Sequence, residues 1–277
     1  MALTSTANFK TFAGITVATY DTLIGQLITR AQSAIEGYCN RVFDSASYRE
    51  YYDGEGTSEL ILTQYPVTAI NLLSTGRTAA LSIMNTSSDA YNAFITVTET
   101  TLQLVVQGGT NADNSSLTLA TYTTMPLLVA AITALAKGWT VQQYTELSYW
   151  AASELLPTGK GKHCLNDYAD LELPDEPEVD FSVDAAAGIL KLWGIFPTGH
   201  QNITVRYTAG YSTIPNDLEQ ICIDLTKLYY DNASINSAVQ SESIGDYSYT
   251  NKDSGISGGF LPKDIRQRLD RWRTHVV

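Results

Sequence analysis

Residue patterns that could support catalysis are few in this chain, and the most suggestive one lies near its C-terminus. Gly255-Ile256-Ser257-Gly258-Gly259 matches the Gly-x-Ser-x-Gly nucleophile elbow, a turn that exposes a reactive serine. Such a turn needs a buried strand before it, and the preceding residues 251–254 are too polar to form one. The only histidine further along the chain, His275, lies in the C-terminal tail. We therefore predict a flexible glycine loop and no hydrolase activity.

Three other patterns could bind a ligand, and each lacks part of what that chemistry needs. His163-Cys164, with His200, could supply zinc ligands, but adjacent side chains of a strand point to opposite faces and there is no second Cys pair. Asp53-x-Glu55 lacks the later ligands of a calcium loop. Gly159-Lys160-Gly161-Lys162 lacks the spacing of a phosphate-binding P-loop. We therefore expect no metal site, no cofactor and no enzyme.

Composition favours a folded protein that binds other proteins. The chain has 277 residues, of which 44% are hydrophobic, and this is enough for a sizeable core. Its formal net charge of -12 argues against general binding to duplex DNA, because neutralising phosphates requires clustered Lys and Arg. An acidic balance instead favours solubility and protein partners.

The cysteines and the N-terminus indicate a reducing compartment. Cys39, Cys164 and Cys222 are odd in number and far apart, so we expect buried free thiols and no disulfide framework. The N-terminus lacks a basic segment followed by an apolar one, and the longest apolar stretch, residues 125–136, is too short to span a bilayer. Neither export nor membrane anchoring is expected.

The N-terminal part of the chain predicts one helix followed by short strands. Apolar residues at three- and four-residue spacings predict an amphipathic helix over residues 21–39. Residues 48–52 and 59–62 flank an Asp-Gly-Glu-Gly segment at 53–56, whose glycines permit positive φ, so this region is predicted to be a β-hairpin. A third strand is predicted over residues 67–73.

Residues 74–185 are rich in Thr, Ser, Ala and Asn, with short alternating runs that predict strands with one buried face. A helix interrupts them at residues 124–136, with Pro126 in its first turn and Lys137-Gly138 as its stop. The region ends in an acidic stretch whose like charges repel, so we predict a solvated, mobile loop, with a cation site or a basic partner surface as the alternatives. Its acidic residues are Asp167, Asp170, Glu172, Asp175, Glu176, Glu178, Asp180 and Asp184.

The chain then returns to strands, predicted at residues 188–193 and 202–207, and to a helix after Pro215. The final helix is predicted to begin at Pro262 and is basic, in contrast to the acidic average. Its cations suit either a solvated helix face or an anchor, through Arg and Trp, in an acidic groove of another chain, with nucleic acid as a secondary partner. The apolar stripe is Ile265, Leu269, Trp272 and Val276, and the cations are Lys263, Arg266, Arg268, Arg271 and Arg273.

These patterns indicate an α+β protein in two parts. Residues 1–73 and 186–277 are expected to form a discontinuous core that combines a small helical bundle with a β-hairpin or short sheet. Residues 74–185 are expected to form an inserted, β-rich α+β module that ends in the acidic loop.

Short motifs follow one another in a fixed order along the core. They are Arg41-Val42-Phe43, Tyr51-Tyr52-Asp53-Gly54, Tyr65-Pro66-Val67, Arg206-Tyr207-Thr208-Ala209-Gly210-Tyr211, Ile214-Pro215, Ser241-Glu242-Ser243-Ile244-Gly245-Asp246-Tyr247-Ser248 and Leu261-Pro262. Each motif is weak alone, but the ordered set is specific. The set resembles the head-to-tail adaptor (connector) proteins of tailed bacteriophages over about residues 15–73 and 186–277. The insertion has no counterpart in the common short form of that family.

The resemblance implies a structural virion protein of the neck, made in the bacterial host cytoplasm. Such adaptors form a homo-oligomeric ring, expected to be twelvefold, that docks beneath the portal protein and continues the DNA channel without sequence-specific DNA binding. The ring also offers a platform for a stopper or tail protein. We predict that Arg266, Arg268, Arg271, Trp272 and Arg273 contact the portal, and that Glu242, Ser243, Ile244, Asp246 and Tyr247 contact a neighbouring subunit or the next ring.

Two other functions are compatible with the sequence. Within the structural class, the chain could be a tail terminator or stopper ring protein. From another class, the insertion could bind a carbohydrate or a host surface, for which clustered exposed aromatic residues are needed. Tyr144, Tyr149 and Trp150 are the candidates. Binding to a portal separates the adaptor from both.

Overall fold

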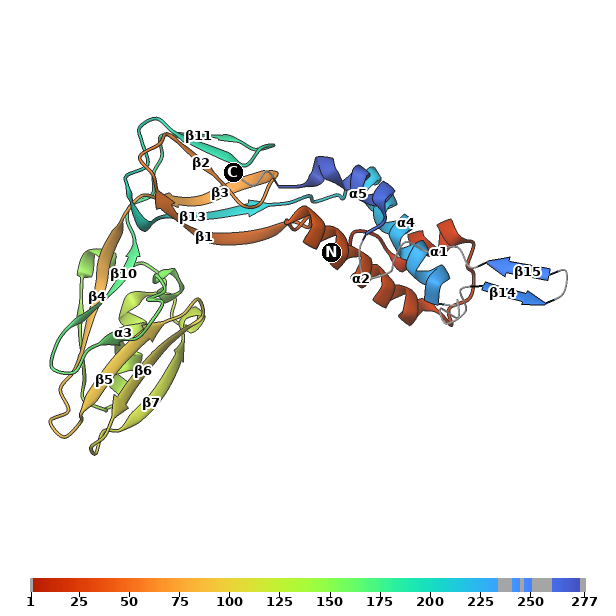
Figure 1. Ribbon diagram of the computed structural model, residues 1–277. Helices are drawn as coiled ribbons and strands as arrows, with labels where there is room; N and C mark the ends of the chain where they lie inside the picture. The colour runs from red at the N-terminus through yellow and green to blue at the C-terminus, as the bar shows by residue number, and fades with distance from the viewer. Residues whose placement is uncertain (1, 234–240, 245–246, 251–260, 275–277) are drawn as a thin grey trace.

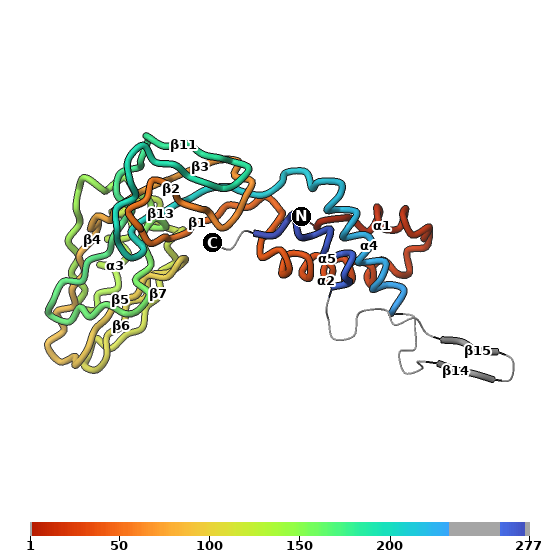
Figure 2. The backbone as a smooth tube through the Cα atoms, turned by 45° about the horizontal axis from the view of Figure 1, so that its top comes forward, coloured from red at the N-terminus to blue at the C-terminus, as the bar shows by residue number. Residues whose placement is uncertain are grey.

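The protein consists of three bodies that follow one another in a bent, elongated arrangement (Figures 1 and 2). The computed structural model describes residues 2–233, 241–244, 247–250 and 261–274. A helical bundle lies at one end and a β-sandwich in the middle. A third body, made of strands and one helix, extends from the far end of the sandwich (Figure 1). The chain runs from the bundle through the sandwich to this third body and then returns. The fold is α+β, as predicted.

The helical bundle is built from both ends of the chain. The predicted amphipathic helix is confirmed as α2 (Asp21–Cys39), and its apolar stripe is buried. Ser5 caps α1 by accepting a hydrogen bond from the Asn8 amide at 3.1 Å. The other helices are α1 (Thr6–Ala13), α4 (Asn216–Ala233) and α5 (Lys263–Leu269), the last continued by the 3-10 turn η4 (Asp270–Trp272). The core contains Leu3, Ala31, Ile35, Cys39, Phe43, Leu218, Ile221, Cys222, Leu225, Leu261, Ile265 and Leu269.

The middle body is a sandwich of two antiparallel three-stranded sheets, ordered β1–β13–β3 and β11–β12–β2. In β13 the inward positions, Ile203, Val205 and Tyr207, are fully buried, as the two-residue alternation predicted. Tyr207 is the bulkiest of the fully buried side chains. The strands are β1 (Ala46–Gly54), β2 (Glu59–Ile61), β3 (Val67–Ser74), β11 (Phe181–Asp184), β12 (Ile189–Leu192) and β13 (Gly199–Ala209).

The predicted β-hairpin is wrong, because its two arms lie in different sheets. β1 pairs with β13, and β2 pairs with β12. At the end of β1 the Gly54 amide donates to Asn202 Oδ1 at 2.9 Å, and a Cβ atom on Gly54 would lie 1.7 Å from the Pro197 carbonyl oxygen. Glycine is therefore needed at this position for a close approach of two segments, and the chain crosses from one sheet to the other.

The third body has a hydrophobic core of its own, whose members all lie between Ala80 and Leu173. The predicted helix is confirmed as α3 (Met125–Ala134). Residues 74–185 are the proposed inserted module, and within that range Phe181 and Val183 pack on the sandwich core. The strands are β4 (Arg77–Asn85), β5 (Asn92–Val97), β6 (Thr101–Gln107), β7 (Asp113–Thr118), β8 (Trp139–Gln143), β9 (Lys162–His163) and β10 (Ala169–Pro174), and the 3-10 turns are η1 (Leu119–Thr121), η2 (Thr145–Leu147) and η3 (Ala152–Glu154).

Much of the acidic stretch is β-strand, where a solvated loop was predicted. β10 buries every second residue, from Ala169 to Leu173, and directs Asp170 and Glu172 away from the core. The Ser82 hydroxyl donates to Asp170 at 2.5 Å. Because acidic and apolar residues alternate, the carboxylates stay near solvent while the strand buries its other face. Charge density alone was therefore a poor guide to the local structure.

Candidate assembly interface

The C-terminal basic segment is a shorter helix than predicted. α5 ends at Leu269, η4 carries the chain to Trp272, and Arg273 has an extended backbone with φ -69° and ψ 142°. Ile265 and Leu269 are buried in the bundle, as their spacing predicted, and Val276 lies outside the described residues. The helix ends early because tertiary contacts hold the residues after Leu269 against the bundle. The Tyr38 hydroxyl donates to Asp270 at 2.6 Å.

Two of the predicted portal-contact arginines form ion pairs within the bundle. Arg268 bonds to Asp224 of α4 at 2.6 Å, and Arg271 pairs with Asp217 of the same helix. Each pair is partly exposed, so its contribution is about 0–1 kcal/mol. Their main effect is to fix the orientation of α5 and η4 on α4.

The outward face of α5 carries two further cations. Lys263 and Arg266 are exposed, and neither forms an ion pair with a described residue. Asp264 is exposed beside them. A partner can therefore reach Lys263 and Arg266 without breaking an intramolecular ion pair of the described structure.

Trp272 packs against the bundle. Its ring meets those of Phe43 and Tyr211 edge-on, with centroids 6.1 Å apart in both cases and interplanar angles of 87° and 83°. Edge-to-face pairs of this kind contribute about 0.5–1.5 kcal/mol each beyond the area they bury. The tryptophan therefore anchors the C-terminal segment to the junction between bundle and sandwich.

A buried arginine lies at the centre of this junction. Arg41 is 4% exposed, and its Nη2 donates to the Tyr65 carbonyl. Its guanidinium carbon lies 3.7 Å from the ring centroid of Tyr65 and 5.0 Å from that of Phe43. A buried charge is costly unless acceptors or aromatic faces compensate it; here one carbonyl and two aromatic faces do so, while the buried Nε has no hydrogen-bond partner among the described residues. The sequence marked Arg41 only through its Arg-x-Phe motif and did not indicate its burial.

The C-terminal segment closes the junction by capping α2. The Thr274 amide donates to the Cys39 carbonyl at 3.0 Å, and its hydroxyl donates to the Asn40 carbonyl at 3.1 Å. The Tyr65 hydroxyl donates to the Arg273 carbonyl at 3.2 Å. Carbonyls at a helix C-terminus have no partner within the helix, so these bonds complete the end of α2.

Gly210 lets the end of β13 approach the same place. Its φ is +106°, and a Cβ atom would lie 2.3 Å from the Asp44 carbonyl oxygen. Its amide donates to the Pro66 carbonyl at 2.9 Å, and the Tyr211 amide donates to the Phe43 carbonyl at 2.8 Å. The Arg-x-Phe, Tyr-Pro-Val and Ala-Gly-Tyr motifs, which are far apart in the sequence, therefore contact one another.

Inside the sandwich, a cluster of hydrogen bonds surrounds Glu50. The Tyr52 and Tyr207 hydroxyls donate to its Oε2, the latter at 2.7 Å, and the Thr63 hydroxyl donates to Oε1. Burial is the largest cause of the raised pKa of Tyr52 and of Tyr207, so both hydroxyls stay protonated and act as donors. The cluster joins β1 and β13 to the segment after β2.

The three cysteines are free and buried, as predicted. Burial raises the pKa of Cys39 to about 11, and those of Cys164 and Cys222 to about 12. A thiol must lose its proton to act as a nucleophile or metal ligand, so these groups are inert at neutral pH.

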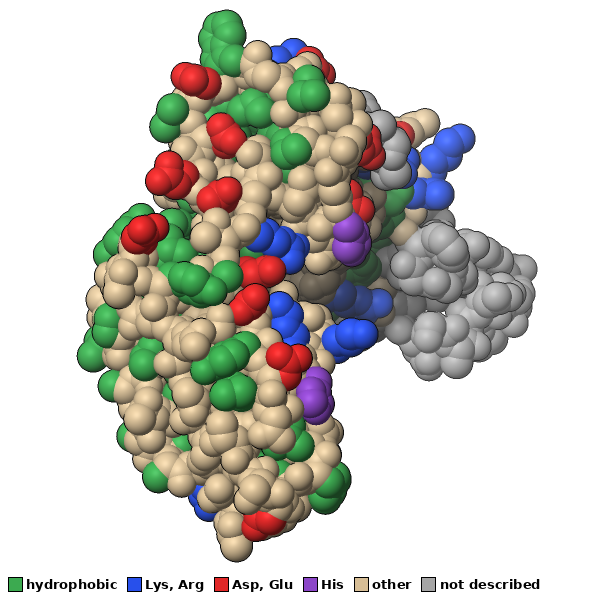
Figure 3. Space-filling model, turned by 90° about the vertical axis from the view of Figure 1, so that its left-hand side faces the viewer, with side chains coloured by type: hydrophobic (Ala, Val, Ile, Leu, Met, Phe, Trp, Pro, Cys, Tyr) green, Lys and Arg blue, Asp and Glu red, His purple; other side chains and the backbone are tan. Residues whose placement is uncertain are grey.

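A second junction joins the sandwich to the third body through two arginines. Arg49 and Arg206 are direct cross-strand partners on β1 and β13, where like charges repel. Arg49 donates to the Ser153 and Glu154 carbonyls at 2.7 Å each, and Arg206 pairs with the Glu154 carboxylate. Figure 3 shows basic side chains gathered at the waist between the two bodies. We call these contacts of Arg49 and Arg206 with Ser153 and Glu154 the clamp. No sequence pattern indicated it.

The predicted inter-subunit segment contains two paired strands. β14 (Ser241–Ile244) is antiparallel to β15 (Tyr247–Thr250), and Ser243 lies opposite Ser248. Asp246 lies outside the described residues, as do Ser257 and His275 of the nucleophile-elbow pattern.

The residues of the remaining ligand-binding patterns do not come together in the structure. His163 is exposed and Cys164 is buried, while His200 lies in the sandwich, 2.9 Å from Asp53. Within the described ranges, no group of three or more His, Cys, Asp or Glu residues could hold a metal ion. Lys162 donates to the Asp170 carbonyl at 2.7 Å.

Among the described helices, none combines the length and the apolar character that a membrane span requires.

The aromatic candidates of the third body differ in exposure. Tyr144 and Tyr149 are exposed, whereas Trp150 packs partly on the core. The rings of Tyr149 and Trp150 lie 6.0 Å apart at an angle of 32°. Two of the three candidates therefore expose their rings to solvent.

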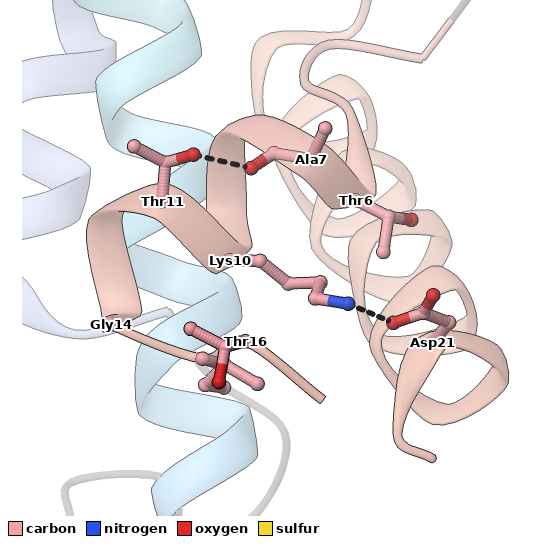
Figure 4. Close-up of a pocket in the computed structure, with 8 residues that line it drawn as sticks. Thr6, Ala7, Lys10, Thr11, Gly14, Thr16 and Asp21 are labelled. Carbon is pink, nitrogen blue, oxygen red and sulfur yellow. Dashed lines mark hydrogen bonds and ion pairs between the residues drawn. The ribbon is translucent and has the colours of Figure 1, made fainter. Parts of the chain in front are cut away.

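A hollow of about 610 Å³ opens beside α1. Lys10 Nζ and Asp21 Oδ1 pair at 2.7 Å, and the Thr11 hydroxyl donates to the Ala7 carbonyl (Figure 4). The ion pair leaves the lining without net charge, and its other residues are neutral.

Comparison with known proteins gives a family match and distant structural matches, among them two chains from gene transfer agent particles. A family model described as head completion protein matches residues 2–124 and 169–275. No curated protein matches the chain. A chain from the neck of an empty gene transfer agent particle, computed with C6 symmetry, is 14% identical with a TM-score of 0.40, and a chain from the native gene transfer agent virion is 14% identical with a TM-score of 0.36. Each alignment covers 99% of this chain and 91% of the other.

Proposed function

This chain belongs to the head completion protein family, and on that basis we propose that it is a head-to-tail adaptor in the neck of a tailed-phage virion. The family is one of structural phage proteins and not a known enzyme class. In this proposal the chain forms a homo-oligomeric ring beneath the portal protein, and the ring continues the DNA channel and presents a platform to a stopper or tail protein.

The convergence of the adaptor motifs carries this proposal. Arg41, Tyr65 and Gly210 belong to separate motifs, and their surroundings join at one junction between bundle and sandwich. Their buried hydrogen bonds and close approaches set the angle between the two bodies. A ring requires each subunit to present the same surfaces in the same geometry, so a fixed junction of this kind suits a ring subunit.

We assign the portal contact to the exposed face of α5, with Lys263 added to the predicted set. Arg266 and Lys263 are available for direct contact, while Arg268, Arg271 and Trp272 hold the segment against the bundle. Arg273 extends this surface from the end of η4. The 242–247 segment is proposed to contact a neighbouring subunit or the next ring.

Charge reversal on α5 tests this assignment. Lys263→Glu combined with Arg266→Glu should abolish co-sedimentation with the portal ring of the same particle and leave thermal unfolding unchanged. Lys160→Glu, a single charge reversal at an exposed cation of the third body, is the control. Undiminished portal binding by the double variant would refute the α5 contact. Deleting the whole segment is a poorer test, because Ile265 and Leu269 belong to the bundle core.

The light-scattering mass of the chain mixed with the portal ring tests the ring itself. Addition of about twelve copies per portal ring would support a twelvefold adaptor with closed symmetry. A different closed number would correct the symmetry and keep the adaptor. Failure to associate would favour a tail terminator or stopper.

A further inference from the structure

We infer that the open side of the β-sandwich is a docking groove for an extended, positively charged segment of a partner polypeptide. A hollow of about 840 Å³ lies there, between the end of β1 and β2. This surface is separate from α5, and the inference does not depend on ring formation. The lining residues that matter for it are Tyr52, Asp53, Glu55, Glu59, Ile61 and Phe196.

Both walls of the groove are edge strands. Within the described sheets, β1 is bonded only to β13 and β2 only to β12. Along the opposite side the two sheets are joined, since the Val67 amide donates to the Ala185 carbonyl and the Glu178 amide donates to the Leu73 carbonyl, both at 2.8 Å. The sandwich is therefore closed along one side and open along the other. Edge strands present unpaired backbone groups to which an extended segment can add.

The rim of the groove is acidic. Its lining includes Asp53, Glu55 and Glu59 and no Lys or Arg. Asp53 and Glu59 contact His200 and Lys191, but both carboxylates stay about half exposed, and Glu55 forms no ion pair with a described residue. Complementary charge favours encounter with a basic partner and excludes an acidic one.

Large apolar side chains stand exposed beside the groove. Phe196, whose side chain is buried, lines it, and the Phe196 amide donates to the Thr57 carbonyl at 2.8 Å, so the loop after β12 forms one lip. The same loop exposes 83% of Trp193 and 64% of Ile195. Figure 3 looks onto this end of the molecule and shows acidic and hydrophobic side chains next to one another on the upper body. Clustered exposed apolar residues of this kind mark binding surfaces.

An extended segment in which cations alternate with apolar side chains satisfies all three features. Its backbone adds to a strand edge, its cations face the carboxylates, and its apolar residues meet the loop that carries Trp193. The occupant is therefore a basic β-strand of a partner protein, which adds by strand augmentation.

The first test is a binding titration with the isolated chain. A fluorescein-labelled peptide of alternating Lys and Val should bind the wild type at low ionic strength. Neutralising Asp53→Asn, Glu55→Gln and Glu59→Gln together should weaken binding about tenfold, since each exposed pair contributes about 0.2–1 kcal/mol. The matched control neutralises three exposed carboxylates elsewhere, Glu146→Gln, Asp167→Asn and Asp264→Asn. Equal affinity for the triple variant and its control would overturn the inference.

The second test separates strand addition from general charge attraction. Peptides N-methylated along one edge lose the hydrogen bonds of that edge, so one of the two methylated forms should lose binding and the other should keep it. Trp193→Ala should weaken binding at least about fivefold, as expected of an anchor residue. Amide shifts in residues 51–61 should accompany binding. Equal binding of both methylated peptides, or shifts caused by calcium chloride and not by peptide, would contradict a strand-docking groove.

Discussion

At the scale of residues, the junction between bundle and sandwich depends on a few positions whose close surroundings leave little freedom to change them. Arg41 carries a charge in a buried place, and the Tyr65 carbonyl and two aromatic faces surround it. Gly210 has a backbone conformation that side chains rarely adopt, next to a carbonyl that leaves no room for one. Both positions are therefore expected to be sensitive to conservative substitution.

Arg41→Met should lower the free energy of unfolding by about 1–3 kcal/mol, because the partly buried Tyr65 carbonyl would lose its donor. Urea denaturation measures this difference. Arg30→Met is the matched control, since Arg30 is exposed and has Tyr229 as a cation–π partner, and it should cost less than about 1 kcal/mol. Equal losses for the two variants would show that the junction does not depend on the buried charge.

Gly210→Ala should be more disruptive than an ordinary Gly→Ala change, with a loss of about 2 kcal/mol or more, because φ is positive and a carbonyl occupies the Cβ position. Gly194→Ala is the control, since a Cβ there meets nothing within 4 Å. Thermal unfolding of the two variants side by side checks the comparison. If Gly210→Ala unfolds at the same midpoint temperature as the wild type, the close approach to Asp44 is ruled out.

The buried cysteines give a pH dependence with a definite sign. Folding raises the pKa of Cys222 from 9.0 to about 12, so the protonated thiol is favoured in the folded state. The corresponding stability is fully present below pH 9 and is lost as pH rises toward 12. Cys222→Ala should therefore reduce the alkaline loss of stability between these values, measured by urea denaturation at several pH values. An unchanged alkaline slope would count against this account.

At the scale of elements, polar groups at the ends of helices and 3-10 turns take part in both junctions. Turn η3 of the third body supplies carbonyls and the Glu154 carboxylate to Arg49 and Arg206, which would otherwise repel across β1 and β13. The C-terminal segment after α5 caps α2 in a similar way. Each junction therefore uses the polar groups that a secondary structure element leaves unpaired at its end.

Glu154→Gln should destabilise the clamp by about 1 kcal/mol, the upper end expected for a partly exposed ion pair, because two facing arginines lose their shared counter-charge. Hydrogen exchange of the β1 and β13 amides near the clamp should increase. Glu146→Gln, at an exposed residue of the same body, should leave exchange unchanged. If hydrogen exchange in Glu154→Gln is no faster than in the wild type, the Glu154 carboxylate has no role in the clamp.

At the scale of the whole molecule, the third body is connected to the sandwich through two neighbouring strands. Arg77 at the start of β4 lies directly opposite Pro174 at the end of β10. The core of the third body is made only of residues between these points. The chain therefore enters and leaves this body at one place, as in a domain inserted into a loop.

Replacing residues 78–173 by a short Gly-Ser linker should leave the bundle and sandwich folded, since Arg77 and Pro174 are already adjacent. The excision removes Glu154 and exposes the facing arginines, so adding Arg49→Thr should stabilise the shortened chain. Size-exclusion chromatography and circular dichroism check both forms. Aggregation of the shortened chain with and without Arg49→Thr would show that the third body is needed for the rest to fold.

Local periodicity determined much of this protein by itself. α2, α3 and the helix after Pro215 follow from apolar spacings of three and four residues, because a helix pairs its backbone within one segment. The burial of the three cysteines and the alternation in β13 also followed from residue types and their local spacing. The order of the short motifs pointed to the family that the comparison then showed.

Only the tertiary structure decided which strands pair and which charges stay free. The arms of the predicted hairpin belong to different sheets, because strand partners are chosen by contacts distant in sequence. The same reason explains Arg41, the clamp on Glu154 and the ion pairs of Arg268 and Arg271: the spacing of charges in a chain does not say which of them folding will bring together.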